Sequence, residues 1–184
     1  MTLIIKTKRL ELRRLQVKDI TPAYVRWLSD PEVTQYLETR HSEQTPESVR
    51  QFVARIADAS DEFLFGIFLS EGRHIGNIKV GPIRAVHQLA DVSLLIGEPD
   101  CRGQGYAAEV IAAVSRFAFT ELSVKKLSAS MYAPNQASAK AFLRVGYRQE
   151  GLRLKHYELD GQRCDLIELG ALPDDIAYTA DDAA

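Results

Sequence analysis

The chain has 184 residues, of which 46% are hydrophobic and 26% charged, and its 23 lysines and arginines nearly balance 25 aspartates and glutamates. This length favours one domain whose core needs no metal or disulfide, and the apolar content excludes a largely disordered chain. The net charge of −2 provides no basic footprint for duplex nucleic acid, although a phosphorylated ligand could bind at a local site.

The first elements predicted from the N-terminus are a strand and a helix. Leucines alternate with charged residues over residues 9–15, which predicts a strand. Asp19 stands where a helix N-cap would, and the apolar residues after it are spaced as one helical face: Ile20, Tyr24, Trp27 and Leu28.

Two proline-marked starts predict the next helices. Asp30 and Pro31 begin a short helix toward Leu37, because proline is favoured at the first helical position. Thr45 and Pro46 begin a longer one. Its apolar face follows the i, i+3, i+4, i+7 spacing at Val49, Phe52, Val53 and Ile56.

Three strands are predicted in the middle of the chain. Residues 62–69 and 74–81 are joined by a turn-like segment at 70–73, which predicts a hairpin. Residues 91–97 are nearly all apolar, which favours a central strand of the sheet.

The second half of the chain alternates helices and strands. A helix over 106–122 is apolar on most sides, a strand follows at 126–132, and an amphipathic helix at 135–145 ends at Gly146. The order strand, helix, strand over 91–132 predicts a parallel pair within a mixed α/β sheet.

The chain closes with a second hairpin and an acidic segment. Residues 147–158 and 163–169 form the hairpin, with Asp160-Gly161 as its turn. Residues 173–184 hold four aspartates and no basic residue, so we expect a loosely ordered tail after a single domain at 1–172.

Several kinds of site and location are disfavoured. Cys101 and Cys164 have no metal-ligand or disulfide spacing, and the four histidines form no metal-binding pair, so no metal is expected. Residues 1–15 lack the apolar core of a signal peptide, and no run reaches the ~18 apolar residues of a membrane span. A cytoplasmic protein without membrane or nucleic-acid partners is the simplest expectation.

The most informative segment is the glycine-rich loop at 97–109, between an apolar strand and a helix. Gly103 and Gly105 allow a tight turn and close approach of a ligand. The first N–H groups of the following helix are unpaired and lie at its positive end, which suits a phosphate or pyrophosphate. A connection without any ligand is the plain alternative.

Two nucleotide-binding motifs are alternatives for this loop. A P-loop is excluded because no lysine followed by serine or threonine comes after the second glycine. Gly103-x-Gly105-x-x-Ala108 matches the dinucleotide fingerprint. However, the next strand ends at residues 129–132 without the required carboxylate, and about 80 remaining residues are too few for a second half of that fold.

A motif aligned from Arg102 instead of Gly103 matches the same loop more closely. Arg102-x-x-Gly105-x-Ala107 resembles the acetyl-CoA pyrophosphate loop of the GCN5-related N-acetyltransferase (GNAT) superfamily. A second block runs from Asn135 and Ser138 to Phe142 and Gly146-Tyr147, and it resembles the superfamily's next motif. Two motifs in the right order are more specific than either alone.

The resemblance covers roughly residues 7–172. The segments Arg9-Leu10-x-Leu12-Arg13 and 30–33 are similar to the branch that acetylates N-terminal amines of ribosomal proteins (RimJ/RimL-like), and to relatives that acetylate nucleotide-linked amino sugars. The resemblance implies a mixed α/β fold with a splayed central parallel strand pair, and acetyl-CoA as co-substrate.

The resemblance also implies where the cofactor binds. The pantetheine arm would enter the gap beside the central strand, and the loop backbone would hold the pyrophosphate. Asn135 and Ser138 would touch the arm, and Lys140 could reach the 3′-phosphate. The other residues implied are Leu94, Leu95, Ile96, Arg102, Gly103, Gln104, Gly105, Tyr106 and Ala107.

The proton donor and acceptor are less defined. Phe142 occupies the position where many superfamily members place a tyrosine general acid, and it cannot donate a proton. Ser138 is the replacement that the ribosomal-protein branch implies, and Tyr132 is a second choice. Asp91 is the first choice for the base, with Glu150 and Glu158 as alternatives. Cys101 lacks a paired base and is treated as a bystander.

The acceptor is left open between a small amine, such as an amino sugar, and a protein N-terminus. Trp27, Tyr36 and His74 are the candidates for acceptor contacts. A catalytically silent CoA-binding sensor or scaffold is the alternative function, favoured by Phe142. Self-association into a homodimer is possible through an edge strand or the closing hairpin.

Overall fold

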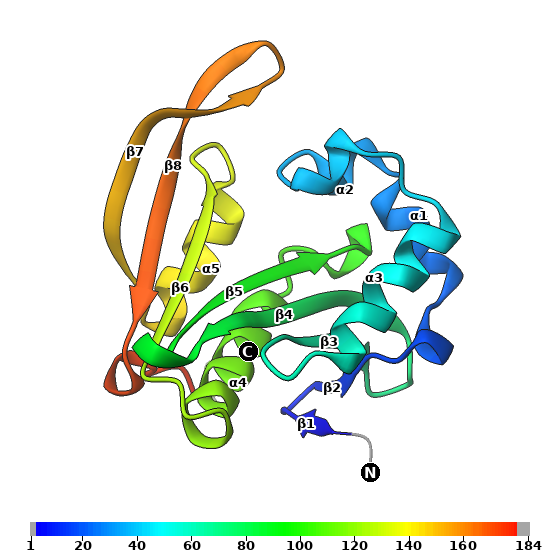
Figure 1. Ribbon diagram of the computed structural model, residues 1–184, viewed down its shortest axis with the longest axis horizontal. Coiled ribbons are helices and arrows are strands. Elements are labelled where there is room, and N and C mark those ends of the chain that lie inside the picture. Colours follow the sequence, from blue (N-terminus) through cyan, green and yellow to red (C-terminus); the bar gives the residue numbers. More distant parts are fainter. Residues whose placement is uncertain (1–2, 180–184) are drawn as a thin grey trace.

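Eight strands form one mixed sheet in the order β1-β2-β3-β4-β5-β6-β8-β7 (Figure 1). The structure is a computed structural model and describes residues 3–179. Its strands are β1 (Ile4–Lys6), β2 (Leu10–Arg14), β3 (Phe63–Leu69), β4 (His74–Arg84), β5 (Leu89–Ile96), β6 (Lys126–Tyr132), β7 (Arg148–Leu159) and β8 (Gln162–Ala171). The three-residue β1 is too short to give a sequence signal and was not predicted.

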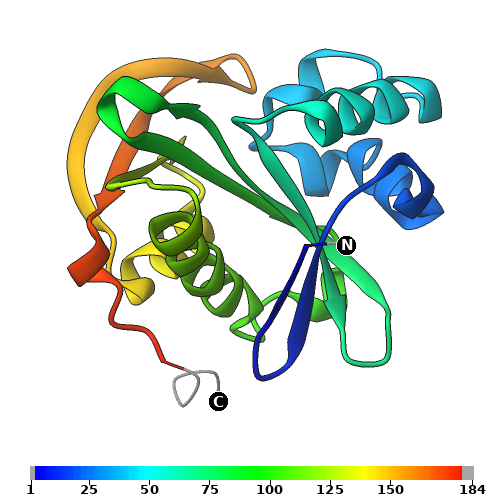
Figure 2. The ribbon, with the colours of Figure 1, turned by 60° about the horizontal axis from the view of Figure 1, so that its bottom comes forward.

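Helices cover both faces of this sheet (Figure 2). One face carries α1 (Pro22–Leu28), α2 (Pro31–Thr34) and α3 (Pro46–Asp58), and the other carries α4 (Tyr106–Glu121) and α5 (Gln136–Val145). Side chains along β3 point alternately to the two faces of the sheet. Phe65 and Ile67 pack in the core beneath α4, and Leu64 and Phe68 pack in the core beneath α1–α3.

Short polar side chains begin the helices on both faces. Thr45 caps α3 and Asp30 caps α2, as predicted, and Asn135 caps α5. The prediction of Asp19 as a cap is wrong. Asp19 closes a 3₁₀ turn by accepting the Gln16 N–H, and Thr21 caps α1 two residues later.

The parallel pair of β5 and β6 is confirmed, and it separates along its length. Pairing runs only from Leu89 opposite Lys126 to Asp91 opposite Ser128. Beyond this point the remaining residues of β5 have no partner on the β6 side, while β4 still pairs with β5 as far as Ile96. Figure 1 shows the two strands diverging. The edge of β5 that faces β6 therefore presents unpaired backbone groups.

The chain after β8 is partly ordered. Pro173–Asp175 forms a 3₁₀ turn, and Tyr178 is only 4% exposed within the α4 core. Arg116 on α4 donates to the Tyr178 carbonyl. The expectation of a loosely ordered tail therefore fails for residues 173–179, because Ile176 and Tyr178 supply apolar surface that packs on the core. Residues 180–184 lie outside the described part of the chain.

Within residues 3–179, the longest apolar helix falls short of what a membrane crossing requires.

Replacing Tyr178 by alanine should lower the free energy of unfolding by about 3 kcal/mol, because it removes a buried ring from the core. Urea denaturation monitored by circular dichroism measures this change. Val86→Ala is the control, since Val86 is 92% exposed and should change stability by less than about 0.5 kcal/mol. Equal stability of the two variants would contradict the packing of this segment.

Candidate functional site

The loop before α4 adopts the conformation that its glycines allow. Gly103 and Gly105 have φ of +73° and +78°, in the left-handed region. Gly105 is the N-cap of α4, so no side chain caps the first turn of that helix. A Cβ at Gly103 would meet nothing within 4 Å, and one at Gly105 would meet only Arg9 Nη2 at 3.5 Å. The free N–H groups of this turn are open to an anion.

A buried carboxylate fastens this loop to the start of β2. Glu109 on α4 is 4% exposed and accepts from Arg9 Nε at 2.7 Å, Arg9 N at 2.9 Å and Thr7 Oγ1 at 2.6 Å. Arg9 also donates to the Gln104 carbonyl at 3.0 Å and lies 4.5 Å over the Tyr106 ring. Arg9 thus fixes the loop, a role that no sequence pattern had indicated.

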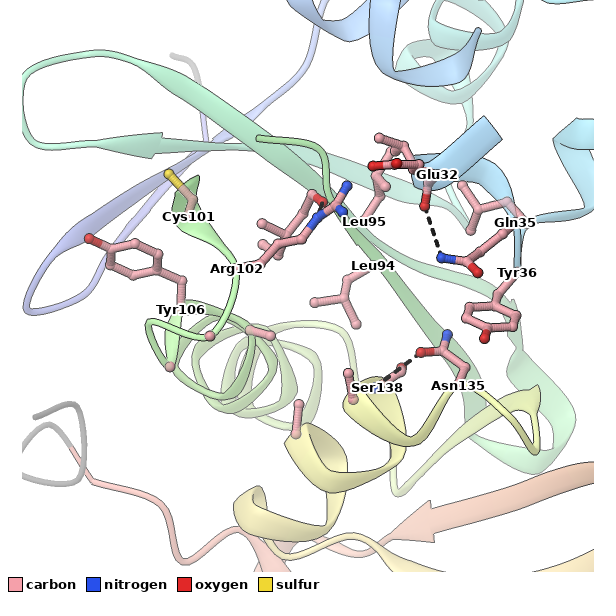
Figure 3. A pocket seen from close by; sticks show the side chains of 18 residues that line it. Glu32, Gln35, Tyr36, Leu94, Leu95, Cys101, Arg102, Tyr106, Asn135 and Ser138 are labelled. Carbon is pink, nitrogen blue, oxygen red and sulfur yellow. Dashed lines mark hydrogen bonds between the residues drawn. The ribbon is translucent and has the colours of Figure 1, made fainter. Parts of the chain in front are cut away.

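A cavity of about 400 Å³ runs from this loop along the splayed part of β5. In Figure 3, Arg102 and Tyr106 lie on one side of Leu94, and Tyr36 and Asn135 lie on the other. Eleven of the predicted residues line it: Tyr36, Leu94, Leu95, Ile96, Arg102, Gly103, Gly105, Tyr106, Ala107, Asn135 and Ser138.

Two of the residues predicted for cofactor binding lie outside this cavity. Gln104 does not line it, and its carbonyl accepts from Arg9 Nη1. Lys140 is exposed on α5. Cys101 does line the cavity, and burial raises the pKa of its thiol, so the thiol stays protonated at neutral pH.

The start of α5 contributes the polar side of the cavity. Asn135 caps the helix by accepting the Ser138 N–H at 3.3 Å, and both residues line the cavity. Phe142 lies one turn further on, is 1% exposed and packs edge-on against Tyr147 at 4.9 Å. Ser138 is therefore the hydroxyl of α5 that reaches this space.

Tyr132, the second predicted proton donor, is engaged elsewhere. Its hydroxyl donates to Glu38 Oε1 at 2.5 Å, and its ring stacks on Tyr157 at 4.6 Å. Burial, and then the bond to Glu38, raise the pKa of Tyr132 to about 12. Tyr132 does not line the cavity, so it ties the segment before α3 to β6 instead of reaching a ligand.

Asp91, the predicted base, lies at the closed end of the splay. It is the last β5 residue paired with β6. Its carboxylate accepts from Ser128 Oγ and forms an ion pair with Arg84 at 2.7 Å. Both oxygens are engaged, and Asp91 lines neither this cavity nor the cavity beneath α1 and α3 that is described below. Asp91 therefore supports the last strand pair. Glu150 pairs with Lys126, and Glu158 accepts from the Gly161 N–H.

Trp27, a predicted acceptor contact, holds α1 against the sheet. It is 2% exposed and donates from Nε1 to Glu98 Oε1 at 2.9 Å. Glu98 also pairs with Arg26 and Arg73. A Cβ at Gly97 would overlap the indole, which explains the glycine at the end of β5. Trp27 does not line the cavity along β5.

His74, also predicted for the acceptor, is a buried structural ring. It is 6% exposed and stacks on Phe68 at 4.6 Å. Its Nδ1 meets Thr21 Oγ1 at 3.0 Å, and its Nε2 meets the Gly76 carbonyl at 2.9 Å and Asn77 Oδ1 at 3.0 Å. Burial lowers the pKa of His74, which keeps the ring neutral.

A second cavity of about 400 Å³ lies beneath α1 and α3 on the other face of β5. It shares Leu37, Leu94 and Leu95 with the first, so the two adjoin at the end of the splay. Sequence patterns missed its polar residues, which include Asn77 and Lys79, because nothing in a strand's alternation tells which face will be hollow. They likewise missed Glu32 and Gln35 in the first cavity.

Comparison with known proteins matches this architecture. The model of the acetyltransferase (GNAT) domain family matches residues 9–148, which include both the glycine loop and α5. The chain belongs to the GNAT acetyltransferase family. Its eight-stranded mixed sheet with a splayed parallel pair is the GNAT fold, and the protein is an acetyltransferase.

Relatives and neighbours of this GNAT protein span several acceptors. An uncharacterized N-acetyltransferase of Bacillus subtilis, YoaA, is 27% identical over 165 residues, which cover 88% of this chain and 92% of the relative. RimL, a ribosomal L7/L12 α-N-protein acetyltransferase in complex with coenzyme A, has a TM-score of 0.83 at 19% identity and covers 94% of this chain and 99% of that one.

Spermidine N-acetyltransferase from Vibrio cholerae, in complex with CoA and spermine, has a TM-score of 0.81 at 18% identity and covers 92% of this chain and 98% of that one. These structures support the RimJ/RimL-like fold, and they show that one fold serves different acceptors.

The buried neutral His74 predicts a pH dependence of stability. Because its pKa in the folded protein lies below the ordinary value of about 6.5, the unfolded chain binds more protons as pH falls below 6.5. The stabilising contribution is complete above that pH and is lost as pH falls toward the folded-state pKa. Urea denaturation between pH 5 and 8, approximate limits around that value, measures it.

His74→Phe is the comparison, because phenylalanine keeps a ring against Phe68 and cannot titrate. The stability advantage of the native protein over this variant should shrink as pH falls below about 6.5. A difference that stays constant with pH would contradict a neutral buried histidine.

Proposed function

We propose that this GNAT protein transfers an acetyl group from acetyl-CoA directly to a primary amine. The observation that carries the proposal is the cavity along the splayed part of β5, which connects the uncapped start of α4 to the hydroxyl of Ser138. It joins an anion site, an unpaired strand edge and a proton donor in one continuous space.

The glycine loop suits the pyrophosphate of the co-substrate. Backbone N–H groups of residues 103–107 supply the donors, since the Arg102 N–H already donates to the Pro99 carbonyl, and Gly105 leaves the approach to them open. Arg102 lines the same cavity and can add a charge-assisted contact. The positive potential is thus local, which suits a chain whose net charge is −2.

The unpaired edge of β5 suits the pantetheine arm. Leu94, Leu95 and Ile96 line the cavity where β6 has diverged, so their backbone groups can pair with the amides of the arm as a neighbouring strand would. A backbone N–H at this edge can also stabilise the oxyanion that develops on the thioester oxygen. Asn135 and Ser138 flank the arm on the opposite side.

The reaction needs a neutral amine and a protonated leaving group. The amine nitrogen bonds to the thioester carbonyl carbon, the carbon–sulfur bond breaks, and its electron pair leaves with the sulfur. Nitrogen loses a proton to solvent water. The thiolate gains one relayed through the Ser138 hydroxyl, which takes a proton from solvent as it gives up its own. The apolar walls of the second cavity lower the pKa of an entering ammonium group and favour the neutral amine.

A catalytically silent CoA-binding sensor is the alternative that Phe142 suggested. Direct measurement separates the two, since a sensor would bind acetyl-CoA without releasing free thiol in the presence of amines. Ser138 supplies a proton donor despite Phe142, and this favours the enzyme.

Gly105→Asp should abolish acetyl-CoA binding measured by titration calorimetry. The carboxylate would stand in the anion site, while the left-handed φ of +78° costs only about 1 kcal/mol of stability. Gly161→Asp is the matched control, because Gly161 has φ of +80°, open space around it and a place in the closing hairpin. Failure of the native protein to bind at millimolar acetyl-CoA would refute the proposal.

Ser138→Ala should lower kcat about 10²-fold at saturating acetyl-CoA, because it removes the proton donor for the thiolate. Ser138→Cys keeps a protic group of similar size and should recover part of the rate. The dissociation constant for acetyl-CoA, measured by calorimetry, should change by less than about threefold in both variants. An unaltered kcat in Ser138→Ala would remove Ser138 from the mechanism.

A further inference from the structure

We propose that the acceptor is an α-amino carbonyl compound with an apolar side chain, whose carbonyl oxygen is bound by Asn77 Nδ2 in the second cavity. This inference rests on the proposed acetyl transfer and names its substrate class. A free amino acid, its amide and the N-terminal residue of a peptide all share this chemistry.

The position of the second cavity suits an acceptor. It adjoins the cofactor cavity at Leu37, Leu94 and Leu95, which line both cavities. Asn77 on β4 pairs directly across from Leu95, so their side chains share one face of the sheet. A ligand that touches Asn77 therefore lies beside the part of β5 that would carry the thioester.

The orientation of the Asn77 amide follows from its neighbours. His74 Nε2 lies 2.9 Å from the Gly76 carbonyl, which can only accept, so Nε2 carries the proton. The same N–H faces Asn77 at 3.0 Å, and Asn77 therefore presents its oxygen to His74. Its Nδ2 lies on the other side of the Cβ–Cγ bond in the same amide plane, away from His74 Nε2.

Thr21 completes this assignment from the other side of the ring. Its Oγ1 accepts the Tyr24 N–H at 3.2 Å and lies 3.0 Å from His74 Nδ1, to which it can donate its own proton. A neutral ring with its proton on Nε2 satisfies every one of these contacts. His74 is thus a positioning residue that fixes Asn77.

Asn77 Nδ2 is a buried donor without a partner. Asn77 is 5% exposed, and its Nδ2 makes no hydrogen bond within residues 3–179. Leaving such a donor unsatisfied costs about 1–3 kcal/mol. A ligand oxygen at this place removes the cost, and a carbonyl oxygen is the matching acceptor for an amide N–H.

Most other polar groups around this cavity are already occupied. Ser48 exchanges bonds with the Thr45 backbone, and Gln44 Nε2 donates to Ser42 and to the Thr39 carbonyl. Lys79 pairs with Glu62 at 2.9 Å. Thr39 Oγ1 is the second buried atom at this cavity without a partner in the described chain.

The side chains that line this cavity favour some classes of acceptor over others. Among the described residues, no aspartate or glutamate lines the cavity, so a polyamine would find no counter-charge for its distal ammonium groups. An apolar side chain fits the walls that Tyr24, Leu28, Val49 and Phe52 provide.

The test compares acceptors that differ by one group. Leucinamide and isopentylamine share the amine and the branched alkyl chain, and only leucinamide carries the carbonyl. Because the α-amino group of leucinamide has a pKa of about 8 and an alkylamine one of about 10.4, kcat/KM for thiol release is calculated per concentration of neutral amine. The ratio of this kcat/KM for leucinamide to that for isopentylamine should be at least about ten, because a site built to bind a carbonyl rejects an analogue that lacks it. Leucine and a leucine-led tripeptide show which source is used, and spermidine should be poorer than leucinamide.

Variants assign this preference to Asn77. In Asn77→Leu the ratio between leucinamide and isopentylamine should fall to about one. Asn77→Asp keeps an oxygen for His74, removes the donor and should give the same loss if the leucine variant does not fold. Gln149→Leu makes the same amide-to-alkyl change on exposed β7 and should keep the native ratio.

Equal values of kcat/KM per neutral amine for leucinamide and isopentylamine in the native protein, or a higher value for spermidine, would overturn this inference and leave the acetyl transfer standing. A ratio that Asn77→Leu and Asn77→Asp both leave as in the native protein would also overturn it. Failure to bind acetyl-CoA by calorimetry would instead refute the proposed function itself.

Discussion

The early end of pairing between β5 and β6 is the constraint on which the site depends. Only three residue pairs join the strands, from Leu89 opposite Lys126 to Asp91 opposite Ser128. Arg84 and Ser128 both bind the Asp91 carboxylate at the last pair, which strengthens that end. Past it, β5 keeps its other neighbour β4, and its free edge opens into the cofactor cavity. Without the divergence, β6 would occupy the space of the ligand.

The buried Glu109 and the half-buried Glu98 fix the positions of the two ends of the site. Glu109 on α4 binds Arg9, and Arg9 in turn holds the Gln104 carbonyl, so the loop is fixed by a residue nearly a hundred positions away. Glu98, just past β5, binds Trp27, Arg26 and Arg73 and so sets the position of α1. Each carboxylate accepts hydrogen bonds from several donors, and these bonds offset the cost of removing its charge from water.

Local patterns predicted what local physics decides. The cap at Thr45, the strand at Lys126–Tyr132 and the two glycines before α4 follow from short-range preferences and were confirmed. The roles of Trp27 and His74 could not be predicted, since an aromatic ring has the same identity in a core and at a pocket wall. Asp19 does not cap α1, because its carboxylate accepts the Gln16 N–H within a 3₁₀ turn instead. Asn77 was missed because its importance comes from an atom that the tertiary fold leaves unpaired.

The polar chain from Thr21 through His74 to Asn77 links the start of α1 to the floor of the acceptor cavity. Thr21 begins the helix and, with the same oxygen, orients the histidine, whose other nitrogen orients the amide. A buried network specifies geometry when its members are satisfied, and here only the Asn77 NH₂ group at its end remains for a ligand. His74, which the sequence suggested for contact with the acceptor, therefore acts one step behind it, and in our proposal the contact itself falls to the Asn77 amide that it orients.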